Sequence, residues 1–177
     1  MARATARRGT ARDLALSAVF AAMMAMGALF SIPFFPVPLS LQTFFVYLGV
    51  LLLGRRAFLS QAVYIVMGLV GLPVFSRGMA GYAVLLGPTG GFLIGFLVGS
   101  LVAGFFYSKM RGRRWSGIIS VALCMGMVFG SGWIWLAYWM QWNFSAALLA
   151  GVLPFLPGDL LKAALALTVS KKVRLWG

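Results

Sequence analysis

Long apolar runs, separated by short basic or proline-rich segments, dominate this sequence. The runs cover residues 14–32, 41–53, 57–72, 90–108, 117–140 and 146–170. A helix rises about 1.5 Å per residue, so about 20 apolar residues are needed to cross the hydrocarbon core of a bilayer. The second and third runs are short for this purpose. We expect them either to extend into flanking segments or to form a thinner, irregular part of the bundle.

The composition supports a membrane location. Hydrophobic residues make up 62% of the 177 positions, the mean hydropathy is +0.99 and 10% of residues are charged, against about 25% in a soluble domain. A water-soluble fold of this length could not bury so much apolar surface. We therefore predict an all-α integral membrane protein with six transmembrane helices. Its one domain would cover residues 13–172, between a basic N-terminal segment, residues 1–12, and a C-terminal segment, residues 173–177.

The basic residues are distributed unevenly among the connecting segments. Thirteen of the 15 Lys and Arg residues lie in residues 1–12, 54–56, 109–114 and 171–177. Cytoplasmic loops of membrane proteins are enriched in Lys and Arg, and six spans with both termini in the cytoplasm put all four segments on that side. Because apolar runs separate these clusters, we reject nucleic acid as a partner and expect contact with anionic lipid headgroups.

The sequence lacks side chains that several enzyme classes require. It contains no histidine, and its only acidic residues are Asp13 and Asp159. Zinc hydrolases, Ser-His-Asp enzymes and glycosidases with paired carboxylates are therefore excluded. A P-loop, which needs a Gly-Lys-Ser/Thr ending, is also absent from the sequence. We expect neither catalysis nor a bound metal or cofactor.

In this orientation, four segments lie on the outer side, and three of them are rich in glycine and proline. The four segments are residues 33–40, 73–89 and 141–146 and the break at residues 154–158. Irregular backbone at a membrane surface is tolerated where it folds over protein or lines a cavity. We therefore expect a roofed pocket that opens outward.

Asp159 and Lys162 are an acid and a base within the last apolar run. They lie three residues apart at a helix start, so both side chains project from one helix face. Asp159 also suits the positive end of the helix dipole. An ionisable residue within a span costs at least ~2.5 kcal/mol and is a functional candidate by default. The alternative is a self-neutralising pair with a structural role only.

Three further places are candidates for ligand contact. Gln42 either binds a polar ligand or ties down the linker that precedes it. Arg77, the basic residue of the outer segments, either attracts an anionic solute or is merely exposed. The glycine-rich start of the run at residues 90–108 either lets a ligand approach backbone N–H groups or simply opens a helix.

Small residues recur along the first predicted helix at spacings of three and four. They are Ala11, Ala15, Ala18 and Ala22, with Ala21 and Ala25 as a second pair. Such spacing lets another helix approach closely in lipid. The series therefore serves either packing within this chain or contact with a partner subunit.

Four segments occur together in an order that resembles a known family. They are Val37-Pro38-Leu39-Ser40-Leu41-Gln42-Thr43, Gly68-Leu69-Val70-Gly71-Leu72-Pro73-Val74-Phe75, Gly87-Pro88-Thr89-Gly90-Gly91-Phe92 and Pro154-Phe155-Leu156-Pro157-Gly158-Asp159-Leu160-Leu161-Lys162. Together they look like BioY, the biotin-binding S component of energy-coupling factor (ECF) transporters. The resemblance extends over residues 11–172.

This resemblance implies a six-helix vitamin-capture protein of the bacterial cell membrane, with biotin held beneath loops near the outer surface. Such an S component lacks ATPase activity. It works with a transmembrane coupling (T) subunit and two ATP-binding-cassette ATPases. The alanine series matches the family's contact with the coupling subunit, and biotin is the transported ligand rather than a cofactor.

The resemblance also implies roles for individual residues. Asp159 and Lys162 would bind the ureido ring of biotin, whose N–H and C=O groups complement a carboxylate beside an ammonium. The valerate tail would extend toward Arg77, or Lys162 would hold the tail carboxylate instead. The other residues implied to contact the ligand are Gln42, Phe75, Tyr82, Thr89, Gly90 and Gly91.

Two other functions remain open from the sequence. A solitary secondary transporter of biotin or another small organic anion would use Asp159 as a proton site. An S component for a different vitamin would keep the architecture and change the ligand. An intramembrane enzyme is disfavoured, because the apolar runs contain a single acid–base pair.

Overall fold

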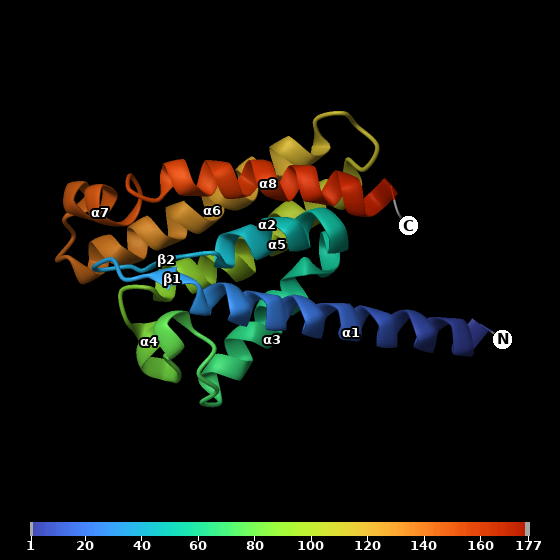
Figure 1. The fold of residues 1–177 in the computed structure, drawn as a ribbon, viewed down its shortest axis with the longest axis horizontal. Coiled ribbons are helices and arrows are strands. Elements are labelled where there is room, and N and C mark those ends of the chain that lie inside the picture. The colour runs from blue at the N-terminus through green and yellow to red at the C-terminus, as the bar shows by residue number, and fades with distance from the viewer. Residues whose placement is uncertain (1, 176–177) are drawn as a thin grey trace.

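The computed structural model describes residues 2–175, and most of them are helical (Figure 1). The elements are α1 (Ala2–Leu29), β1 (Ser31–Ile32), β2 (Leu39–Ser40), α2 (Gln42–Leu53), the 3-10 turn η1 (Gly54–Arg56), α3 (Ala57–Leu69), the 3-10 turn η2 (Ser76–Gly78), α4 (Tyr82–Leu86), α5 (Gly90–Lys109), α6 (Ser116–Trp139), α7 (Phe144–Gly151) and α8 (Leu156–Leu175). The two short strands pair in antiparallel fashion. Met1 and residues 176–177 of the predicted terminal segments lie outside the described residues.

Four segments of the described chain are long and apolar enough to cross a membrane. They are Ala11–Leu29, Gln42–Leu69, Gly90–Lys109 and Ser116–Trp139. A fifth is obtained when Phe144–Gly151 and Leu156–Val173, which meet at an angle of 51°, are taken as one broken span. The chain is therefore a multi-pass membrane protein, and the count of six spans with both termini in the cytoplasm stays a prediction.

The segment Gln42–Leu69 is folded back on itself. Gln42 Nε2, at the start of α2, donates a hydrogen bond of 2.5 Å to the Tyr64 hydroxyl in α3. The two residues are 22 positions apart, and a straight helix would separate them by about 33 Å. The reversal occurs at η1, where Gly54 has a φ of 57°. The segment is thus two short helices rather than one long one.

Glycines permit the close approach of α5 and α6. Gly91, Gly95 and Gly99 recur every four residues on the α5 face that packs against α6. A Cβ at Gly91 would come 2.2 Å from Trp135 Cβ, and one at Gly95 would come 2.8 Å from Val128 Cα. In lipid, helix association depends on such close packing rather than on exclusion of water.

Both described ends of the chain lie at one end of the bundle, together with the α5–α6 turn (Figure 1). The β1–β2 pair, α4 and α7 lie at the opposite end. At the end that holds the termini, Asp13 of α1 forms an ion pair with Arg56 of η1. The basic segments of the sequence therefore gather on one side of the molecule, and the segments rich in glycine and proline gather on the other.

Candidate ligand-binding site

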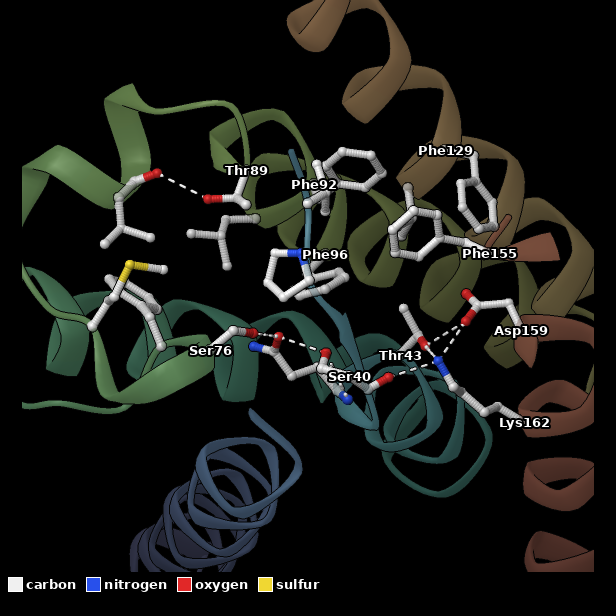
Figure 2. A pocket seen from close by; sticks show the side chains of 18 residues that line it. Ser40, Thr43, Ser76, Thr89, Phe92, Phe96, Phe129, Phe155, Asp159 and Lys162 are labelled. Carbon is white, nitrogen blue, oxygen red and sulfur yellow. Dashed lines mark hydrogen bonds and ion pairs between the residues drawn. The ribbon is translucent and has the colours of Figure 1, made fainter. Parts of the chain in front are cut away.

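A cavity of about 60 Å³ lies at the end of the bundle opposite the termini. Phe92, Phe129 and Phe155 lie together on one side, and Ser40, Thr43, Ser76 and Lys162 lie along the other (Figure 2). The phenylalanines are Phe75, Phe92, Phe96, Phe129 and Phe155, and the polar residues are Ser40, Gln42, Thr43, Ser76, Thr89, Asp159 and Lys162. An apolar wall facing a few convergent polar groups is typical of a small-molecule site.

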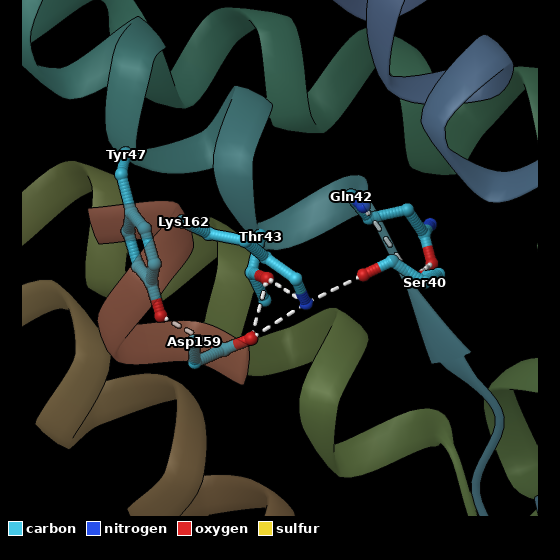
Figure 3. A network of polar contacts seen from close by, with 6 residues as sticks. All are labelled: Ser40, Gln42, Thr43, Tyr47, Asp159 and Lys162. Carbon is cyan, nitrogen blue, oxygen red and sulfur yellow. Dashed lines mark hydrogen bonds and ion pairs between the residues drawn. The ribbon is translucent and has the colours of Figure 1, made fainter. Parts of the chain in front are cut away.

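The Asp159 carboxylate is the centre of the polar side (Figure 3). It is 2% exposed and lies in the first turn of α8. Its Oδ1 accepts hydrogen bonds from Thr43 Oγ1 at 2.9 Å and from Lys162 Nζ at 2.7 Å. Its Oδ2 accepts one from the Tyr47 hydroxyl at 2.9 Å. Two donors from α2 and one from α8 therefore stabilise the buried carboxylate. These hydrogen bonds offset the free-energy cost of removing the charge from water.

Lys162 is fully engaged within the chain. Besides Asp159, its ammonium donates to the Ser40 carbonyl at 2.6 Å and to Thr43 Oγ1 at 3.1 Å. An ammonium has three N–H donors, whereas an ionised carboxylate has about four acceptor positions. Asp159 therefore has room for another N–H donor, but a ligand carbonyl that binds Lys162 must replace one of its present partners.

Gln42 belongs to a second network on the same side of the cavity. The Tyr64 hydroxyl donates to the Val74 carbonyl at 2.9 Å, so it accepts from Gln42 Nε2. This fixes the orientation of the amide. Gln42 Oε1 accepts from Ser40 Oγ at 2.9 Å and from Ser76 Oγ at 2.8 Å. The second N–H of Gln42 makes no hydrogen bond to any residue in the described chain and is available to a ligand acceptor.

A wider hollow of about 580 Å³ adjoins the cavity. The two spaces share Pro38, Met79, Val84 and Thr89 in their walls. The exposed residue Arg77 lines this outer hollow and does not line the inner cavity. A ligand could therefore occupy the inner cavity with one end and reach Arg77 with the other.

The apolar wall is built from rings that constrain one another. Phe92 lies 6.5 Å from both Phe129 and Phe155, measured between ring centroids. Phe75 is 1% exposed and packs edge-on against Tyr64 at 5.6 Å. Rings held at fixed angles present flat apolar surfaces to a ligand.

Three residues expected at the site lie outside the cavity wall. Tyr82 is 67% exposed on α4 and lines neither the cavity nor the outer hollow. Gly90 and Gly91 are buried against other parts of the chain: a Cβ at Gly90 would meet the Leu85 carbonyl, and one at Gly91 would meet Trp135. Close packing thus explains these glycines, while the neighbouring Thr89 does line the cavity.

Several polar residues of the site were not singled out from the sequence. Thr43 and Tyr47 bind Asp159, and Ser40 and Ser76 bind Gln42. Thr43 and Tyr47 are four residues apart in a mostly apolar run, which places both on one helix face. That spacing was the available signal, although it does not identify the partner on α8.

The alanine series on α1 divides between two faces. Ala11, Ala15, Ala18 and Ala22 are all exposed. Ala21 is fully buried, and Ala25 is partly buried and packs against the core. Packing within the described chain therefore explains the alanines that face the core. It leaves Ala11, Ala15, Ala18 and Ala22 without a covering element in the described chain.

The chain is similar to known proteins over nearly its whole length. A family model described as the BioY family matches residues 2–176. A probable biotin transporter BioY from Pyrococcus horikoshii is 37% identical and the alignment covers 93% of this chain and 97% of that protein. The biotin transporter BioY from Thermotoga maritima is 35% identical, with 92% and 96% covered.

A solved structure has the same fold. The S-component for biotin from an ECF-type ABC transporter superposes with a TM-score of 0.86 at 30% sequence identity. The superposition covers 96% of this chain and 94% of that one. The arrangement of helices and loops around the site is therefore that of a solved substrate-binding subunit.

Proposed function

The chain belongs to the BioY family, and we propose that it is the biotin-specific S component of an ECF-type importer. It is a substrate-binding transport subunit rather than an enzyme, in line with relatives that are named as biotin transporters. The observation that carries the proposal is the buried Asp159–Lys162 pair, which faces a wall of phenylalanines at the end of the bundle opposite the termini.

The ureido ring of biotin fits the polar side of the cavity. Asp159 has acceptor capacity left after its three hydrogen bonds, so it accepts a ureido N–H. The ureido C=O accepts from the remaining N–H of Gln42, or from Lys162 once that ammonium releases the Ser40 carbonyl. The fused rings then lie against the phenylalanines, including Phe75. Biotin is the transported ligand in this proposal, and we expect no cofactor.

The valerate tail extends into the outer hollow. Thr89 lies on the boundary between the two spaces, and Arg77 lines the hollow beyond it. A guanidinium can pair with the tail carboxylate in bidentate fashion. In the alternative pose, Lys162 holds the carboxylate and the ureido ring faces outward. The first pose is favoured because the neighbours of Lys162 already occupy all three of its N–H donors.

The protein crosses a bacterial plasma membrane six times, with both termini in the cytoplasm. The reversal between α2 and α3 supports counting them as two spans, and the 51° bend supports counting α7 and α8 as one broken span. Together with α1, α5 and α6 they make six. The clustering of basic segments at one end supports the orientation.

Energy for import comes from partner subunits. The chain has no nucleotide-binding motif of its own, and the similar solved structure is an S-component from an ECF-type ABC transporter. The partners are a transmembrane coupling subunit and two ABC ATPases. The coupling subunit packs on the exposed face formed by Ala11, Ala15, Ala18 and Ala22, because small side chains there let another helix approach closely.

The function is tested by titrating the purified protein with biotin and recording tryptophan fluorescence and the unfolding temperature Tm. We expect a saturable fluorescence change and a Tm that rises with biotin concentration, because a ligand that binds the folded state stabilises it. Lipoate is the matched control ligand, since it carries the same valerate tail without the ureido ring. A response to lipoate equal to that for biotin, or no response to biotin, would contradict the proposal.

A further inference from the structure

A separate cavity of about 250 Å³ lies at the other end of the bundle, near the termini. The α5–α6 turn contributes Arg113 and Arg114 to its wall, and the last turns of α8 contribute Lys171. Leu167 of α8 and Leu51 of α2 line its apolar part. The cavity thus combines three cationic side chains with an apolar floor, and it shares no residue with the biotin site.

The chain supplies no acidic side chain to balance these three cations. The whole sequence has two acids. Asp13 pairs with Arg56, and Asp159 pairs with Lys162. Neither acid lines the cavity near the termini. No acidic side chain of the sequence therefore neutralises Arg113, Arg114 and Lys171, whose exposed side chains are open to an external anion.

The start of α6 also presents unused donors to this cavity. Ser116 is 6% exposed and lines the cavity, and its hydroxyl makes no hydrogen bond to another residue of the described chain. Gly117 and Ile118 line the cavity too. Their backbone N–H groups, in the first turn of α6, donate to no backbone carbonyl within residues 2–175. Free N–H groups at a helix start favour an anion, above all a phosphate.

We propose that this cavity binds the phosphate group of an anionic phospholipid from the leaflet on the side of the termini. The phosphate sits at the start of α6 between Arg113, Arg114 and Lys171. A lipid fits better than a free phosphate because apolar side chains beside the cavity are exposed: Trp115 is 58% exposed and Ile118 is 48% exposed. These side chains give the acyl chains a surface to pack on. Basic pockets between membrane helices bind anionic headgroups in this way.

The test compares two triple variants of the full chain, purified in detergent, by native mass spectrometry. The cavity variant is Arg113→Gln/Arg114→Gln/Lys171→Gln. The matched control is Lys109→Gln/Arg111→Gln/Lys172→Gln, which removes the same charge from the same turn and helix end but from outside the cavity wall. Each protein is titrated with dioleoyl phosphatidylglycerol, with dioleoyl phosphatidylcholine, and with inorganic phosphate. Biotin binding is measured in every variant to show that it is folded.

We expect the wild-type chain to retain one phosphatidylglycerol at a concentration at least tenfold below that needed for phosphatidylcholine. The cavity variant should lose at least fivefold in affinity for phosphatidylglycerol, and the control less than twofold. Ser116→Ala, which keeps every charge, should lose two- to threefold. Equal losses of phosphatidylglycerol affinity in the two triple variants would overturn the proposal, because the lipid would then be attracted by the overall positive charge of this end rather than bound in the cavity. Binding of inorganic phosphate as tight as that of phosphatidylglycerol would overturn the assignment to a lipid.

Discussion

At the scale of single residues, the Asp159 carboxylate is held in place before any ligand arrives. Thr43 and Tyr47 donate to it from α2, and Lys162 donates to it from its own helix. A buried charge is tolerated only when it is paired and hydrogen-bonded. The same contacts that make the charge tolerable also orient it, so little conformational freedom remains to be lost on binding, which favours affinity.

Replacing Asp159 tests its role directly. We expect Asp159→Asn to raise the dissociation constant for biotin at least tenfold, about 1.4 kcal/mol, because the amide retains the volume but loses the charge and acceptor capacity. The substitution also leaves Lys162 without its ion-pair partner, so Tm should fall. Both quantities are measured by titration and thermal unfolding of the purified variant.

The control for this substitution is Asp13→Asn. It removes the other acid of the chain, which pairs with Arg56; the Asp13 side chain is 17% exposed and the Arg56 side chain is 61% exposed. Neither residue of this pair lines the cavity, so biotin affinity should change less than twofold. Wild-type affinity in Asp159→Asn would leave the Asp159–Lys162 pair a structural role only.

At the scale of elements, the cavity depends on how closely helices approach. Gly68 of α3 leaves room for the Phe75 ring, whose Cζ would lie 2.1 Å from a Cβ at this position. Phe75 in turn packs on Tyr64, which binds Gln42. One small residue on α3 therefore positions both the apolar wall and part of the polar network.

We expect Gly68→Ala to push the Phe75 ring toward the cavity and to weaken biotin binding at least fivefold, measured as the dissociation constant. Gly126→Ala is the matched control, because a Cβ at that position of α6 meets no atom within 4 Å. The control should keep the affinity, and it should raise Tm slightly since alanine favours a helix over glycine. Unchanged affinity in Gly68→Ala would show that Phe75 is not a determinant of the site.

At the scale of the whole molecule, the candidate ligand site and the proposed partner surface lie on different parts of the chain. The candidate site lies at one end of the bundle, among the loops (Figure 1). The exposed alanines run along the side of α1. Biotin binding and coupling to partner subunits should therefore respond to different substitutions.

Replacing both Ala15 and Ala18 by tryptophan should leave the dissociation constant for biotin within twofold, because neither residue lines the cavity. Biotin uptake by cells that also express the coupling subunit and ATPases should fall at least tenfold, since the bulky rings prevent close helix approach. Ala122→Trp/Ala164→Trp places the same rings on exposed positions of α6 and α8 and should preserve uptake. Normal uptake in Ala15→Trp/Ala18→Trp would show that the partner surface does not lie on this face of α1.

Local features of the sequence were sufficient for part of this description. The membrane class, the apolar runs, the Asp159–Lys162 pair and the spacing of the alanines all depend on composition or on spacings of a few residues, whereas the exposure of four of these alanines came from the structure. Hydropathy and helical spacing act over one or two turns, so they can be read without knowing the fold. The resemblance to BioY, carried by four short segments, also predicted the family that the comparisons confirm.

Only the tertiary structure decided which residues share the cavity. Thr43 and Tyr47 bind Asp159 across 116 and 112 positions of sequence, and no spacing rule connects residues that far apart. The glycine-rich start of α5 suggested a ligand contact at Gly90 and Gly91, but helix packing uses both glycines and leaves Thr89 at the cavity. A glycine permits close approach by any neighbour, and whether that neighbour is a ligand or another helix depends on how the helices pack.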